Sequence, residues 1–151
     1  MNYWLFKNEP DAYGVDDLDA ESDKTTSWNG VRNYQARNFM RDDMQVGDIG
    51  FFYHSNCDVP AVVGIIEIVR EAYVDHTAFD SNDKYFDAKS DPDNPRWFMV
   101  DVKLVRKLDR EIPLREIKEH ADKLEGFRLI AKGNRLSVMP VEPEHWKLVL
   151  S

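Results

Sequence analysis

The feature that most constrains the fold is a series of short apolar stretches separated by turn residues along the whole chain. Two of these stretches are long: 61–69, which is rich in Val and Ile, and 97–105, which begins with Trp, Phe and Met and holds three Val. The second begins as a continuous apolar run and ends in strict alternation of apolar and polar residues, a pattern typical of a half-buried antiparallel strand. We therefore expect two long neighbouring strands, and a β-rich domain rather than a helical one.

Shorter elements surround these two strands. We predict further strands at 3–6, 49–53 and 136–138, helices at about 33–42, 113–119 and from Pro143, an acidic segment at 9–23 that docks through Val15 and Leu18, and a surface loop at 75–93. With 151 residues the chain has the usual size of one domain. The sequence thus predicts a single α+β, β-rich domain over 1–151, a small β-barrel with helices at its periphery.

The charge balance restricts the partners. The chain has 20 Lys and Arg against 28 Asp and Glu, a formal net charge of −8, which argues against binding long phosphate stretches. The acids concentrate in 9–23 and 75–93, whereas 32–41 holds three Arg and no acid. We therefore expect few phosphate contacts and a weak dependence of any nucleic-acid binding on salt.

Residue types that carry metal, cofactor or membrane chemistry are absent or scattered. Cys57 is the only cysteine, the four His residues are far apart in the sequence, and the glycines form no phosphate-binding loop. The chain also has no run of about 18 apolar residues and no signal-peptide pattern. These observations predict no metal, no cofactor and no membrane, and we expect a cytoplasmic protein, with a monomer assumed.

Aromatic residues beside amides and bases are the more informative pattern. Trp28, Tyr34, Tyr53 and Trp97 each adjoin polar residues that would face a cleft. A planar base stacks on such rings with about 1–3 kcal/mol per base, while amides read its edge. Most aromatics of a small barrel only fill the core, which we expect for Tyr3, Trp4, Phe6, Phe51 and Phe52.

Six strings in order along the chain resemble the EVE domain family. They are YWLFKNEP (3–10), WNGVRNYQARN (28–38), VGD (46–48), FYHSN (52–56), NPRWFMVDV (94–102) and RLSVMPV (135–141). Because they span the whole chain, this resemblance is far more specific than any single motif. It implies a PUA-like β pseudobarrel with peripheral helices and no catalysis.

The resemblance also implies a ligand pocket for a modified base, such as a methylated or hydroxymethylated base, flipped out of DNA or RNA. The implied base-binding residues are Lys7, Asn8, Glu9, Trp28, Val31, Arg32, Asn33, Tyr34, Tyr53, His54, Ser55, Trp97, Arg135 and Ser137. Flanking phosphates would be held by Arg32, Arg37, Arg96 or Arg135. The chain departs from the family pattern at Asn8, where Ser is commoner, and at Met139, where Gln is commoner, and both changes bear on base selectivity.

Two alternative functions stay open at this point. One is an enzyme acting on a nucleobase or nucleoside, with His54 as general base and Glu9 or Asp48 as its partner. The other is a sensor of a free modified nucleoside. Adjacent residues of a strand point to opposite faces, so His54 and Ser55 do not by themselves make a nucleophile and base pair.

Overall fold

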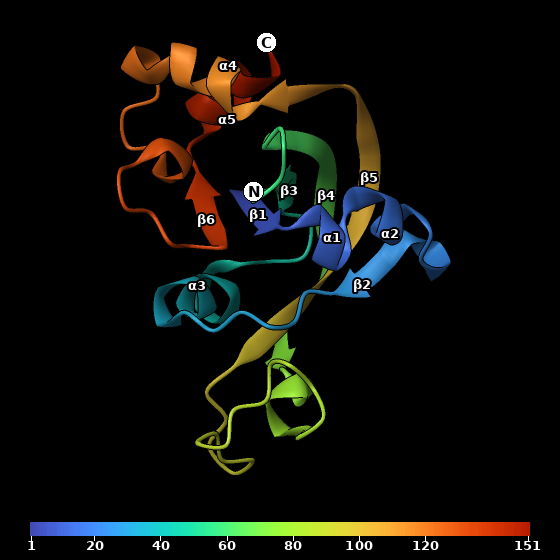
Figure 1. The fold of residues 1–151 in the computed structure, drawn as a ribbon. Helices are drawn as coiled ribbons and strands as arrows, with labels where there is room; N and C mark the ends of the chain where they lie inside the picture. Colours follow the sequence, from blue (N-terminus) through green and yellow to red (C-terminus); the bar gives the residue numbers. More distant parts are fainter.

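The computed structural model describes residues 1–151 and is built on one six-stranded sheet (Figure 1). The strands are β1 (Tyr3–Asn8), β2 (Thr25–Ser27), β3 (Ile49–His54), β4 (Ala61–Val74), β5 (Phe98–Pro113) and β6 (Val138–Val141), in the spatial order β2-β5-β4-β3-β1-β6. Strands β1 and β3 pair in parallel, and all other neighbours are antiparallel.

The long pair β4 and β5 gives the sheet its curvature. Their register shifts at four places, between Val62 and Gly64, Ile65 and Ile66, Ile68 and Arg70, and Arg70 and Tyr73. Each such irregularity increases the local twist, so both strands bend and the sheet curls around its own core. The edge strands β2 and β6 do not pair with each other, so the sheet is an open pseudobarrel of the PUA-like kind expected from the sequence.

The helices are short and lie at the periphery of the sheet (Figure 1). They are α1 (Pro10–Tyr13), α2 (Val15–Asp19), α3 (Tyr34–Asn38), α4 (Leu114–Glu119) and α5 (Pro143–Leu150), with a π-helical turn η2 (Phe39–Asp43) and 3₁₀ turns η1 (Ser22–Lys24), η3 (His76–Phe79), η4 (Ala121–Lys123) and η5 (Arg128–Ile130). The predicted helix at 33–42 is thus α3 continued by η2. Val15 and Leu18 dock α2 on the sheet as predicted, since both are buried.

The core is one cluster of buried side chains from the sheet and the helices that pack against it. Phe6, Phe51 and Phe52 are fully buried and Trp4 nearly so, which confirms the core assignment for these four rings. Tyr3 is half-buried and stacks on Trp146 at a centroid distance of 4.8 Å. In α5 the ring of Trp146 also stacks on Phe51, so the C-terminal helix closes this end of the core.

The sheet differs from the sequence prediction in the lengths of several strands and in one edge strand. Strand β4 continues to Val74, past the predicted 61–69, and β6 covers Val138–Val141 instead of the predicted 136–138. Strand β5 continues eight residues past 105, although residues 105–107 are all exposed, because pairing with β4 supplies hydrogen bonds that the weak apolar pattern does not signal. Strand β2 is only Thr25–Ser27, and three polar residues show no periodicity that would predict it. It forms by pairing with Asp101–Lys103.

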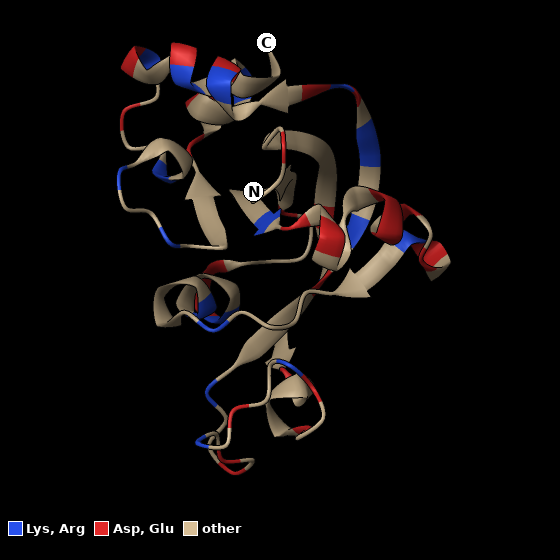
Figure 2. Ribbon diagram, viewed as in Figure 1, with Lys and Arg blue, Asp and Glu red and all other residues tan.

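Charges are unevenly placed on this fold. Figure 2 shows acidic residues concentrated on α1, α2 and the turn that follows them. Three of these acids pair with lysines, at Lys24–Asp19, Lys103–Asp23 and Lys107–Asp16. No helix is long and apolar enough to span a membrane.

Candidate functional site

A hollow of about 190 Å³ opens where β1 ends, and we call it the aromatic slot. Its lining residues are Asn8, Ala12, Tyr13, Thr26, Ser27, Trp28, Asn29, Lys84 and Tyr85. They come from four separate segments: the end of β1, helix α1, strand β2 with the residues after it, and the loop between β4 and β5. Three aromatic rings and two side-chain amides therefore converge on one small space.

Trp28 forms the fixed wall of the slot. Its backbone N–H donates to the Val100 carbonyl at 2.8 Å, which extends the pairing of β2 with β5 by one residue. Its ring packs edge-on against Phe6 and Phe52, at centroid distances of 5.2 and 5.3 Å. Since only 5% of Trp28 is exposed, the ring belongs to the core and offers the slot one restricted surface.

Tyr85 forms another part of the slot wall and comes from the loop at 75–97. Its ring lies so close to Gly30 that a Cβ atom at residue 30 would stand 2.5 Å from two ring carbons. Gly30 also has a φ of +81°, which L side chains rarely adopt. Glycine is thus required at this position both by the positive φ angle of the backbone and by the close packing of the Tyr85 ring.

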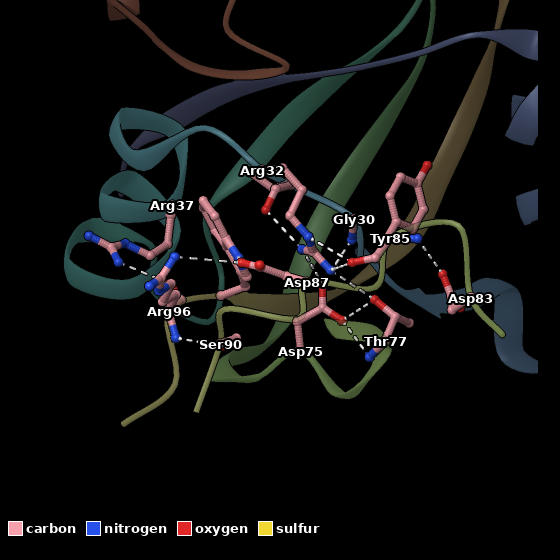
Figure 3. Close-up of polar contacts among 12 residues, drawn as sticks. Gly30, Arg32, Arg37, Asp75, Thr77, Asp83, Tyr85, Asp87, Ser90 and Arg96 are labelled. Atoms are coloured by element: carbon pink, nitrogen blue, oxygen red, sulfur yellow. Dashed lines mark hydrogen bonds and ion pairs between the residues drawn. The ribbon is translucent and has the colours of Figure 1, made fainter. Parts of the chain in front are cut away.

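A buried ion pair, which we call the Arg32–Asp75 latch, holds this loop in place (Figure 3). The fully buried Asp75 carboxylate accepts hydrogen bonds from Gly30 N at 2.8 Å, Arg32 Nη1 at 3.0 Å, and the Thr77 N–H and hydroxyl. Arg32 also donates twice to the Tyr85 carbonyl, at 3.1 and 2.7 Å. The latch therefore ties the segment that bears Trp28 to the loop that bears Tyr85.

The Asp75 carboxyl group stays ionised in the latch. Burial alone would raise the pKa of Asp75, but the hydrogen bonds from Thr77, Gly30 and Arg32 together outweigh it and hold that pKa below its ordinary value. Asp75 is therefore a carboxylate at neutral pH, and the Arg32 guanidinium is its counterion. The charge of Arg32 is thus neutralised within the protein.

The polar groups of the slot retain free hydrogen-bonding capacity. Asn8 Oδ1 accepts a hydrogen bond from the Glu9 N–H at 2.9 Å. The NH₂ group of the Asn8 amide has no acceptor in the protein. Asn29 donates its backbone N–H to Ser27, and its side chain makes no hydrogen bond. Two amides that can each donate or accept thus face a space between aromatic rings.

A second hollow of about 320 Å³ adjoins the slot, and we call it the cation hollow. Its lining residues are Lys7, Asn8, Glu9, Ala12, Ser55, Lys84, Tyr85, Arg135, Leu136 and Ser137. Asn8, Ala12, Lys84 and Tyr85 line both hollows. The two spaces are therefore neighbouring parts of one site.

Half of the fourteen predicted site residues line these two hollows. They are Lys7, Asn8, Glu9, Trp28, Ser55, Arg135 and Ser137. Strand pairing brings them together, because the Lys7 N–H donates to the Ser137 carbonyl and the Ser55 N–H to the Asn8 carbonyl. Whether they contact a ligand stays a prediction.

The structure places the other predicted residues outside the hollows. Val31 and Tyr53 are core residues, and burial raises the pKa of Tyr53 to about 12. Asn33 caps α3 by accepting from the Ala36 N–H. Arg32 belongs to the latch.

Trp97 does not share a hollow with Trp28, contrary to the expectation of a joint Trp28 and Trp97 pocket. Its ring stacks on Tyr34 at a centroid distance of 4.9 Å, and its indole N–H donates to Asp87 at 2.7 Å. The Arg32 guanidinium lies 5.4 Å from the same ring. Trp97 and Tyr34 therefore brace the loop at 75–97 beside the latch.

His54 has a structural partner. Its Nε2 accepts a hydrogen bond from the Val15 N–H at 3.1 Å, at the start of α2. Burial lowers the pKa of His54, in keeping with a neutral ring that accepts this bond. Asp48 lies at the opposite end of β3 and is buried against the Trp4 indole N–H, so it cannot serve as the partner of His54.

Seven of the nine slot residues are absent from the predicted set: Ala12, Tyr13, Thr26, Ser27, Asn29, Lys84 and Tyr85. Tyr13 lies in the predicted acidic segment 9–23, and Lys84 and Tyr85 lie in the segment predicted to be a surface loop. The structure thus places two residues of the predicted surface loop 75–93 on the slot. The one sequence signal is the aromatic pair Tyr85-Phe86 with Lys84 beside it in an otherwise acidic loop.

The fold and this site define a PUA-like barrel with a small aromatic pocket, and the comparisons assign it to a family. The EVE domain model matches residues 2–151, so the chain belongs to the EVE domain family. Thymocyte nuclear protein 1 of Gallus gallus is 47% identical over 99% of this chain and 67% of its own length. The Danio rerio protein is 48% identical over 98% of this chain and 70% of its own length.

Solved structures give the same assignment. The crystal structure of human THYN1 in complex with 5-methylcytosine containing DNA has a TM-score of 0.94 and 43% identity, covering 99% of this chain and 96% of that one. A protein of Pseudomonas syringae has a TM-score of 0.92 and 44% identity, covering 98% of this chain and 97% of that one. The fold and much of the sequence are thus shared with a eukaryotic and a bacterial protein.

Proposed function

We propose that this protein is a non-catalytic module that binds DNA carrying a modified base, with the base flipped into the aromatic slot. The observation that carries the proposal is the slot itself, where Trp28 and Tyr85 form two walls and the Asn8 and Asn29 amides keep free hydrogen-bonding groups. A related structure, that of human THYN1, holds DNA with 5-methylcytosine. At about 190 Å³ the slot is smaller than the roughly 300–1,000 Å³ of a pocket for a drug-sized ligand, which suits a single base.

The slot offers the three interactions that such a base needs. Aromatic walls stack the ring, amides read the edge that pairing in a duplex would occupy, and Ala12 with the rings supplies apolar surface for a methyl group. One buried methyl contributes about 0.8 kcal/mol, which corresponds to a preference of about four-fold for the methylated base.

The absence of catalysis is part of the proposal. The Nε2 lone pair of His54 is taken by the Val15 N–H, and Asp48 lies at the far end of the same strand. His54, the candidate general base, therefore accepts a hydrogen bond from the first residue of helix α2. Incubation with modified nucleosides and oligonucleotides, followed by mass spectrometry, is expected to show no turnover.

Anisotropy titrations test the binding proposal. One labelled duplex carries a single 5-methylcytosine and a second has cytosine at that position, at the same salt concentration. We expect tighter binding of the modified duplex, and equal affinities would contradict the proposal. The same titration with an RNA of the same sequence tests whether the protein binds RNA as well as DNA. Calorimetry with the free modified nucleoside tests the alternative that the protein is a nucleoside sensor.

Tyr85 gives the matched pair of variants for the slot. Tyr85→Ala removes one wall and is expected to weaken binding by roughly ten-fold, within the 1–3 kcal/mol of one stacked base. Tyr85→Phe keeps the ring, and because the Tyr85 hydroxyl makes no hydrogen bond within the protein, this variant should fold and bind the modified base like the parent. Equal loss in both variants would show that the ring is not the contact.

A further inference from the structure

Three cations of the cation hollow have no acidic partner. The seven ion pairs of the structure use Lys24, Arg32, Arg41, Arg96, Lys103, Lys107 and Arg110. Lys7, Lys84 and Arg135, which all line the hollow, take part in none of them. The only acid of the lining is Glu9, and its carboxylate accepts a hydrogen bond from Asn56 Nδ2 at 3.0 Å. A protein of net charge −8 thus keeps three unpaired cations around one space.

Lys7 is the most informative of the three. It lies near the end of β1, half-buried, and burial lowers the pKa of its ammonium group. A half-buried cation without a counterion costs free energy in the unliganded protein. Nothing in the packing requires this charge, since the strand pairing uses only the backbone of Lys7.

Lys84 connects the hollow to the aromatic slot. It lines both spaces, and its Nζ lies 4.9 Å from the centroid of the Tyr85 ring. A group bound by Lys84 would therefore stand directly beside a base stacked on Tyr85. In a nucleotide, the group one sugar away from the base is a phosphate.

We propose that the cation hollow binds the phosphate next to the flipped base, so that the unit recognised is one nucleotide, base and phosphate together. This inference rests on the proposed function, because it takes the slot as the base site. Lys7, Lys84 and Arg135 supply charge-assisted donors, and the phosphate supplies the acceptors and the counter-charge that the protein lacks. Ser55 and Ser137 add hydroxyl donors on the same lining.

The charge count sets the salt dependence. If the hollow neutralises one phosphate of B-DNA, the slope of log K against log salt should be about −0.9, and it should be no steeper than about −2.7 even if each of the three cations contacts a different phosphate. The rest of the chain has 17 Lys and Arg against 28 Asp and Glu, so we expect few further phosphate contacts. A much steeper slope would mean that other cations bind the backbone.

Neutral phosphate analogues provide the direct test. A duplex with one 5-methylcytosine carries a methylphosphonate at the phosphate 5′ or 3′ of that base, each in turn, and a control duplex carries it five nucleotides away. We expect one adjacent position to weaken binding by about ten-fold, the effect of a single charge-assisted hydrogen bond, and the distant position to have no effect. No effect at either adjacent position overturns the inference.

Variants connect that effect to the hollow. Lys84→Ala should weaken binding of the parent duplex by a similar factor, and the sensitive methylphosphonate should then cost less than it does in the parent protein, because only Lys7 and Arg135 remain to bind that phosphate. Lys89→Ala, in the same loop but outside the hollow, is the matched control and should bind like the parent. Full additivity of Lys84→Ala and the analogue would contradict a shared contact.

Lys7→Met supplies a readout that a purely structural role would not produce. It keeps the aliphatic chain and removes the unpaired charge, so thermal stability should rise while binding weakens. If the parent does not prefer the methylated duplex, the proposed function fails. If it does, but the analogues and the cation variants leave affinity unchanged, only the phosphate assignment fails.

Discussion

The Arg32–Asp75 latch and the cation hollow both involve Tyr85 but use their charges in opposite ways. In the latch, Asp75 is fully buried and every donor around it is matched to an acceptor. In the hollow, Lys7, Lys84 and Arg135 are left without acids. The paired charges of the latch hold the loop in place, whereas the unpaired charges of the hollow are available to a ligand.

Breaking the latch should have the largest effect on stability. Asp75→Ala leaves Arg32 and the Gly30 N–H without their acceptor, which we expect to cost about 3–5 kcal/mol, as for other broken buried pairs. Urea denaturation followed by Trp fluorescence measures the loss. Asp93→Ala, exposed in the same loop, should change stability by less than about 0.5 kcal/mol. A small loss at Asp75 would show that the latch is not what fixes the loop.

Gly30→Ala should act on the slot more than on the fold. The new Cβ strains a backbone at φ +81° and displaces the Tyr85 ring, so we expect a loss of about 1–3 kcal/mol and greatly weakened binding of methylated DNA. Gly126→Ala is the control, because Gly126 has a similar φ of +87° and no atom within 4 Å of its Cβ position. It should lose similar stability and no affinity.

Acid should weaken the latch in a defined pH range. The pKa of Asp75 is lowered in the folded protein, so its contribution to stability is complete above the ordinary carboxyl value of 3.8 and is lost as pH falls through the lower folded value. Stability measured at pH 5, 4 and 3 should therefore fall less steeply in Asp75→Asn than in the parent. Parallel curves would mean that Asp75 does not titrate with unfolding.

The smallest effect on stability is expected in the hollow. Lys84→Ala removes an exposed side chain with no ion pair, so the free energy of unfolding should change by less than about 0.5 kcal/mol. Circular dichroism during thermal unfolding is sufficient to measure it. A large loss of stability would show that Lys84, like the latch residues, stabilises the fold, and would contradict the contrast between the two regions.

Local sequence patterns were sufficient to predict most of the fold. Alternation and Val/Ile content located β4 and β5, Pro113 and Pro143 marked the starts of α4 and α5, and the aromatic run at residues 3–6 located β1. These elements could be predicted because each buries its own apolar side chains, which periodicity reports directly. Strand β2 and the outer half of β5 could not, because pairing partners distant in sequence decide them.

The sequence by itself determined a β-rich domain of the EVE family and the half of the site that lies on or beside the strands, such as Asn8, Trp28 and Ser137. Only the tertiary structure brought Lys84 and Tyr85 onto the slot and turned Arg32, Tyr34 and Trp97 into supports for their loop. The physical reason is that Asp75 and Gly30 are 45 residues apart and joined by a part-buried hydrogen bond. Contacts of that kind leave no periodic trace in a sequence.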